Sequence, residues 1–124
     1  MTTILVVDDE EGVVRVLSGL AKRLAPDAAV LEARNSGEAF GAIERQRIDF
    51  LIVDLNLNER LNGFHILEKA KEKNPALETL IITGDARMNA EEEGKKYGIK
   101  FVVEKPIKVS NLKEIFLDFL KLRP

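Results

Sequence analysis

The chain has 124 residues, no cysteine and a formal net charge of −2, from 19 lysines and arginines against 21 aspartates and glutamates. This length suits one domain with a single hydrophobic core and leaves no room for a second. The lack of cysteine excludes disulfides, thiolate metal sites and cysteine catalysis, and the charge balance argues against direct binding of nucleic acid.

The N-terminus has no basic segment, and its first apolar run, at 4–7, is too short for a signal peptide or a membrane span. We therefore expect a cytoplasmic protein with no membrane contact. We also expect one domain over residues 1–124 with no output domain. The residues leave open whether it acts alone or as part of a longer regulator.

Short apolar runs alternate with segments of helical spacing along the chain. The runs predict five strands, at 4–7, 28–33, 50–54, 77–83 and 101–103. The first helix is predicted between Asp9 and Pro26, and the second runs from a cap at Asn35 or Ser36 to near Gln46. The third ends at Asn74. The fourth spans 86–97, and the last follows the apolar stripe from Leu112 to Leu120. The fourth has mostly small residues on one face, so we expect it to be loosely held.

This alternation implies right-handed crossovers and helices on both faces of a parallel sheet. The predicted fold class is α/β, a flavodoxin-like, doubly wound sheet of five parallel strands in the order 2-1-3-4-5, with five helices. In that order the first and third strands meet at the switch point, where such sheets bind ligands. These strands would bring Asp8, Asp9 and Asp54 together.

Polar residues stand at the ends of four predicted strands: Asp8 and Asp9, Asp54, Thr83, and Lys105. Taken singly, each has an ordinary explanation, since aspartates cap helices, threonine suits strands and lysine suits surfaces. Three carboxylates at one switch point, however, repel each other unless a cation is present. Magnesium prefers such oxygen ligands, and Asp9 and Asp54 are candidates for direct coordination.

An aspartate carboxylate can attack a phosphoryl group when the charge on the transferring oxygens is neutralised. Asp54 is the candidate nucleophile. Lys105, whose backbone Pro106 restricts, would neutralise that charge together with magnesium. Thr83 would donate a hydrogen bond to a phosphoryl oxygen. The pattern therefore predicts a magnesium-dependent site for aspartyl phosphorylation.

These residues belong to four short motifs, Val7 to Glu10, Leu51 to Asp54, Ile82 to Gly84 and Glu104 to Pro106. Their order and spacing, over the whole chain, resemble the receiver domain of two-component response regulators. Receiver domains are a standard example of the 2-1-3-4-5 sheet. The predicted strand order and the family resemblance therefore do not support each other independently.

The resemblance implies that Asp54 accepts phosphate from a sensor histidine kinase or a histidine phosphotransfer protein. Thr83 and Lys105 would bind the phosphoryl oxygens. The last two strands and helices would then rearrange and change binding to a downstream protein, an output domain in a longer chain or a second copy. His65, the only histidine, is expected to be a packing or surface residue, so the donor histidine comes from a partner.

The resemblance also implies a set of magnesium ligands. Asp9 and Asp54 would bind the ion directly, and Asp8 largely through water. The backbone carbonyl of Asn56 would complete the protein's share of the coordination.

Two features depart from the family pattern. Val102 stands three residues before Lys105, where receivers usually carry an aromatic residue that moves with the threonine. Phe101 should point to the opposite face of its strand and belong to the core. The loop at 56–62 is one residue longer than usual, with Asn58 where proline is common, and is expected to affect partner choice or phosphate lifetime.

Three other functions can be compared with this one. A protein-binding module that works without phosphorylation is favoured by Val102 but not by the acidic residues and Lys105. A haloacid-dehalogenase-like phosphatase would need a second aspartate two residues after the first, where this chain has Asn56. A dinucleotide-binding enzyme would need a glycine-rich loop after the first strand, which is missing.

Overall fold

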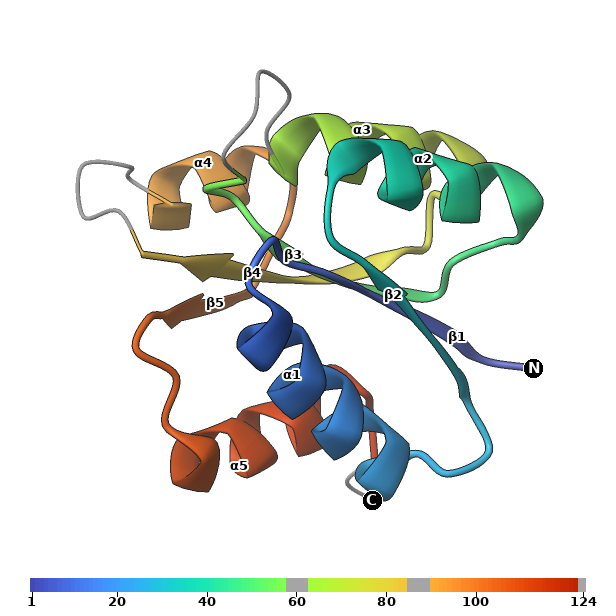
Figure 1. Cartoon of the computed structure of the whole chain (residues 1–124). Helices are drawn as coiled ribbons and strands as arrows, with labels where there is room; N and C mark the ends of the chain where they lie inside the picture. The colour runs from blue at the N-terminus through green and yellow to red at the C-terminus, as the bar shows by residue number, and fades with distance from the viewer. Residues whose placement is uncertain (58–62, 85–89, 123–124) are drawn as a thin grey trace.

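The computed structural model describes residues 1–57, 63–84 and 90–122 (Figure 1). Its strands are β1 Thr3–Val7, β2 Ala29–Ala33, β3 Phe50–Asp54, β4 Glu78–Thr83 and β5 Phe101–Glu104. Its helices are α1 Glu11–Leu24, α2 Ser36–Arg45, α3 Gly63–Lys73, α4 Ala90–Lys96 and α5 Val109–Phe119. Every predicted element is present, and the strand bounds agree to within one residue. The predicted start of the fourth helix lies outside the described residues.

The five strands form one parallel sheet in the order β2-β1-β3-β4-β5, which confirms the predicted fold class. The register places Val7 beside Val53, Asp54 beside Ile82 and Thr83 beside Glu104. The carboxyl ends of β1, β3, β4 and β5 are therefore level along one edge of the sheet.

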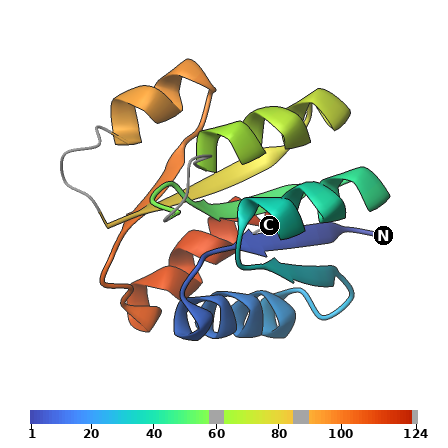
Figure 2. The same ribbon diagram turned by 45° about the horizontal axis from the view of Figure 1, so that its top comes forward.

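Helices cover both faces of the sheet, with α1 and α5 on one side and α2, α3 and α4 on the other (Figures 1 and 2). Successive residues of a strand point alternately into two hydrophobic cores, one on each face of the sheet. Ile4 and Ile52 pack in the cluster with α1 and α5, whereas Leu5 and Leu51 pack in the cluster with α2 and α3. Because both faces are buried, the middles of the central strands are continuous apolar runs instead of alternating with polar residues.

The starts of α1 and α2 are held differently. The Asn35 side chain, one of the two predicted caps, caps α2 by accepting a hydrogen bond of 2.8 Å from the Glu38 backbone N–H, and Ser36 is the first residue of the helix. The N-cap position of α1 is Glu10, whose side chain makes no capping bond. Asp8 accepts a 2.9 Å hydrogen bond from the Glu10 N–H instead. Helix capping by an aspartate side chain therefore does not account for Asp8 or Asp9.

The two residues at the start of β5 point to opposite faces, as predicted. Phe101 packs against Phe119 of α5, with ring centroids 5.4 Å apart. Val102 packs on the other face, beside Leu55 and Ile81. Phe101 is thus a core residue.

None of the described helices is long and apolar enough to cross a membrane.

Candidate functional site

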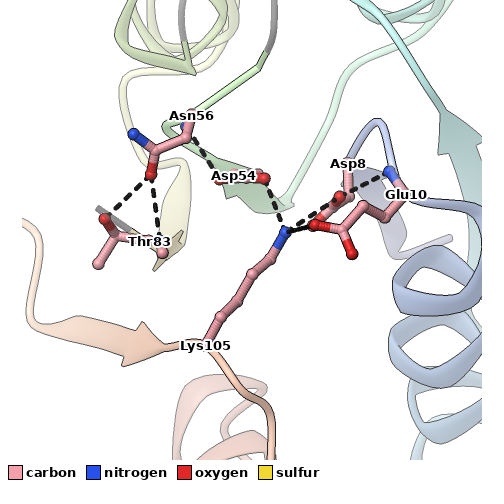
Figure 3. A network of polar contacts seen from close by, with 7 residues as sticks. Asp8, Glu10, Asp54, Asn56, Thr83 and Lys105 are labelled. Carbon is pink, nitrogen blue, oxygen red and sulfur yellow. Dashed lines mark hydrogen bonds and ion pairs between the residues drawn. The ribbon is translucent and has the colours of Figure 1, made fainter. Parts of the chain in front are cut away.

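The predicted site residues meet at the carboxyl edge of the sheet (Figure 3). Asp8 follows β1, Asp54 ends β3, Thr83 ends β4 and Lys105 follows β5. Asp8, Asp54 and Lys105 are in direct contact. Four strands that are far apart in sequence therefore build one site, because parallel strands direct all their carboxyl ends to the same edge.

The Lys105 ammonium lies at the centre of this site. Its Nζ is 3.0 Å from Asp54 Oδ2, 3.2 Å from Asp8 Oδ2 and 2.8 Å from Glu10 Oε1. Burial opposes the charge on Lys105, but hydrogen bonds to Glu10 and Asp54 and the charges of Asp54 and Asp8 outweigh it and raise the pKa of the ammonium above its usual value. Lys105 is therefore positively charged throughout the physiological pH range.

Asp54 is almost entirely buried, with 1% of its surface exposed. Its Oδ2 pairs with Lys105, and its Oδ1 accepts a hydrogen bond of 2.9 Å from the Asn56 N–H. Both contacts fix the orientation of the carboxylate at the strand end.

Asp8 is fully buried. Burial, together with the negative charge of Asp54, raises the pKa of Asp8 to about 6, although the hydrogen bond from the Glu10 N–H and the charge of Lys105 work in the other direction. Within the described part of the chain, no group donates a hydrogen bond to Asp8 Oδ2, whose charged neighbour is Lys105. A buried carboxylate oxygen in this state is suited to a further positive charge.

Thr83 connects to Asp54 through Asn56. The Asn56 Oδ1 accepts hydrogen bonds from Thr83 Oγ1 and from the Gly84 N–H, both at 3.1 Å. The Lys105 N–H in turn donates to the Thr83 carbonyl at 2.8 Å. The ends of β3, β4 and β5 are therefore linked by hydrogen bonds around the candidate phosphoacceptor (Figure 3).

The acidic residues after β1 form a candidate cation site. Carboxylate oxygens of Asp8, Asp9 and Glu10 lie within 4.8 Å of one another, with Asp8 buried and the other two exposed. Oxygen donors of this kind match the preference of Mg²⁺. The buried Asp8 Oδ2 that receives no hydrogen bond from the described residues adds a second reason why a cation would fit here.

Three residues of the site were not predicted in the roles that they have. The Glu10 carboxylate pairs with Lys105, the Asn56 side chain joins β3 to β4, and Gly63 packs directly against the Asp54 backbone. Only the pairing of Glu10 with Lys105 had a signal in the sequence, because Glu10 stands directly after Asp8 and Asp9 at the end of a buried strand. Asn58 and the rest of the extended loop, 58–62, lie outside the described residues.

The family model for the response regulator receiver domain matches residues 4–117. The chain therefore belongs to the receiver domains of two-component response regulators, which are signalling domains.

The chain is also similar to segments of longer sensor and regulatory proteins. The chain is 30% identical over 111 residues to the sensor protein EvgS of Escherichia coli, with 90% of this chain and 9% of that protein covered. It is 29% identical over 110 residues to the probable transcriptional regulatory protein TcrX of Mycobacterium tuberculosis, with 89% of this chain and 46% of that protein covered. The chain thus spans less than half the length of these curated relatives.

Solved structures support the fold. A CheY-like response regulator receiver domain protein from Methanospirillum hungatei superposes with a TM-score of 0.82 at 23% identity, with 98% of this chain and 95% of that chain covered. At this identity the similarity establishes the five-stranded, doubly wound fold.

Proposed function

We propose that this receiver domain is a phosphorylation switch in which Asp54 accepts a phosphoryl group. The observation that carries the proposal is the ion pair of 3.0 Å between Asp54 and Lys105, which joins a buried carboxylate at the switch point to a partly buried ammonium. A nucleophile beside a fixed positive charge is what phosphoryl transfer requires, since the protein contributes mainly orientation and charge stabilisation.

In the proposed reaction an Asp54 carboxylate oxygen attacks the phosphorus of a phosphodonor. A new P–O bond forms to Asp54 while the bond from phosphorus to the donor breaks, and the leaving group keeps that electron pair and takes a proton from solvent or from its own protein. Lys105 stabilises the negative charge on the phosphoryl oxygens. The Thr83 hydroxyl, 3.1 Å from Asn56 Oδ1, can rotate to donate to a phosphoryl oxygen instead.

Magnesium would be held by Asp8, Asp9, Asp54 and the Asn56 carbonyl. Bound there, the ion neutralises the charge that builds up on the transferring oxygens. The buried Asp8 carboxylate supports this assignment because its Oδ2 receives no hydrogen bond from the described residues. Asp9 is exposed at the edge of the site, so its carboxylate is accessible to an ion that enters from solvent.

The proposed donor is a sensor histidine kinase or a histidine phosphotransfer protein. His65, the only histidine in the sequence, is exposed on α3 and does not belong to the site. The signal would pass to a downstream protein, to an output domain in a longer chain or to a second copy that associates on phosphorylation. We propose no direct contact with nucleic acid or a membrane.

Val102 favours a second function, a protein-binding module that works without phosphorylation. Its side chain packs beside Leu55 and Ile81, in the place where receivers usually carry an aromatic residue. Phosphorylation at Asp54 would then leave partner binding unchanged.

The deciding experiment is the intact mass after incubation with acetyl phosphate, with and without magnesium. We expect one phosphoryl group per chain, dependent on magnesium, in the wild type and in Asp27→Asn, a control that removes an exposed carboxylate far from the site. Asp54→Asn should gain none. A folded wild type that gains no phosphoryl group from a donor active on another receiver would favour the second function.

A further inference from the structure

All the donors of the Lys105 ammonium are in use in the unphosphorylated site. A lysine has three N–H groups and can donate three strong hydrogen bonds. The Nζ donates to Glu10 Oε1 at 2.8 Å, to Asp54 Oδ2 at 3.0 Å and to Asp8 Oδ1 at 3.4 Å (Figure 3). A phosphoryl oxygen on Asp54 can therefore receive a hydrogen bond from Lys105 only by replacing one of these carboxylates.

Glu10 is the carboxylate that can leave at the lowest cost. Its side chain is 62% exposed, whereas those of Asp54 and Asp8 are 2% and 0% exposed. A carboxylate that leaves an ion pair and enters water regains its hydration, whereas the buried Asp8 would be left without compensation. Asp54 loses its carboxylate charge on phosphorylation, so the Lys105 donor that it releases can reach one phosphoryl oxygen, and a second contact of Lys105 with the phosphoryl group has to come from Glu10. The shortest contact of Lys105 is thus also the easiest to give up.

The backbone of Glu10 is fixed while its side chain can turn. The Glu10 N–H donates to Asp8 Oδ1, and its carbonyl accepts hydrogen bonds from the Val13 and Val14 N–H groups, both at 3.1 Å. The side chain makes no capping bond to α1. Rotation of the side chain away from Lys105 therefore disturbs neither the start of α1 nor Asp8.

We propose that Glu10 is a positioning residue that holds Lys105 in the unphosphorylated site and competes with the phosphoryl group for its ammonium. This inference rests on the proposed function and adds regulation to it. A second contact between Lys105 and the phosphoryl group replaces the contact with Glu10, so Glu10 lowers the affinity of the site for the phosphoryl group. It also keeps Lys105 ordered over Asp54 while no phosphate is present.

Three variants separate the contact from the charge. Glu10→Gln removes the charge. Glu10→Asp keeps the charge but is one carbon shorter, so its carboxylate cannot reach Lys105 in the same way. Glu11→Gln removes the neighbouring charge, whose partner is Arg34 at 2.8 Å and not Lys105.

The measurement is the affinity for beryllofluoride, a phosphoryl analogue that binds an aspartate carboxylate, followed by fluorine NMR at saturating magnesium. Glu10→Gln and Glu10→Asp should each bind roughly threefold more tightly than the wild type, the size expected when a largely exposed ion pair is lost. Glu11→Gln should match the wild type. In the protein without beryllofluoride, the Lys105 side-chain NMR signal should shift in both Glu10 variants and not in Glu11→Gln.

The outcomes distinguish this inference from the proposed function. If the wild type binds and neither Glu10 variant binds more tightly, competition by Glu10 is wrong while phosphorylation of Asp54 stands. If only Glu10→Gln binds more tightly, the effect belongs to charge and the proposed contact is again wrong. If the wild type fails to bind under conditions in which another receiver binds, the proposed function fails, and competition at Lys105 fails with it.

Discussion

Gly63 lies directly behind the candidate phosphoacceptor, at the first residue of α3. A methyl group on Gly63 would be 2.6 Å from the Asp54 carbonyl oxygen and 3.1 Å from Leu55 Cα. Both neighbours are backbone atoms and cannot turn aside, so glycine is what allows α3 to begin so close to the end of β3. The residue therefore helps to set the position of Asp54 without touching its carboxylate.

Gly63→Ala should lower the free energy of unfolding by roughly 1–3 kcal/mol, the usual effect of overfilling a packed site. Urea denaturation followed by circular dichroism measures it. The matched control is Gly19→Ala in the exposed interior of α1, where the added methyl group meets nothing within 4 Å. That change should stabilise the protein by about 0.5–1 kcal/mol, because alanine is the better helix former. If the two variants are equally stable, the close approach at Gly63 does not matter.

At the scale of elements, α4 itself contacts β4 and β5, and Tyr97, the residue that follows it, ties it to α3. The Tyr97 ring, just after α4, stacks on Phe64 with centroids 5.2 Å apart, and its hydroxyl donates to Glu68 Oε1 at 2.7 Å. The Tyr97 carbonyl accepts a hydrogen bond of 2.9 Å from Lys71 Nζ. On the sheet side, α4 presents Gly94, which has no side chain to bury. This arrangement gives a physical reason for the expectation that α4 is loosely held.

Tyr97→Ala should therefore open α4 locally without unfolding the domain. Loss of the aromatic stack and its packing should speed amide hydrogen exchange in α4 by about tenfold, equivalent to roughly 1.4 kcal/mol of local stability. Exchange in α5, which packs on the other face of the sheet, should not change. Tyr97→Phe keeps the ring and removes only the hydroxyl bond, so its exchange should resemble the wild type. Equal protection of α4 in all three proteins would contradict this account.

For the whole molecule, the fold was predictable because its signals are local and repeated. Each central strand is a short apolar run buried on both faces, and each run ends at a polar residue. The positions of Asp8, Asp54, Thr83 and Lys105 follow from that pattern, since a parallel sheet brings the ends of its strands together. The family match and the strand order confirm the predicted family and fold.

The contacts within the site were less predictable because they depend on distances between segments far apart in sequence. A glutamate at the start of a helix can serve the helix dipole alone, and nothing local indicates that Glu10 meets an ammonium 95 positions away. The Asn56 amide, which bridges to Thr83 and Gly84, and the close approach at Gly63 are similar cases. To predict each of these contacts, one would need the register of two neighbouring strands or the position of a helix on a strand.

The same network makes the stability of the whole molecule depend on pH. The pKa of Asp8 is about 6 in the folded protein, against an ordinary value of 3.8. Between these values the folded protein binds more protons than the unfolded chain, so the free energy of unfolding falls as the pH rises. The stabilising effect of protonated Asp8 is complete below about pH 4 and is lost as the pH rises through about 6.

Asp8→Asn should remove this dependence, because asparagine stays neutral at every pH. A shift of about two pKa units corresponds to about 3 kcal/mol, so the stability of the variant relative to the wild type should rise by that amount between pH 4 and pH 7. Urea denaturation without magnesium across this range measures the difference. Asp27→Asn, which removes an exposed carboxylate, should differ from the wild type by a constant amount. A constant difference for Asp8→Asn as well would mean that Asp8 ionises like an exposed carboxyl group, and that its burial against Asp54 creates no need for a cation.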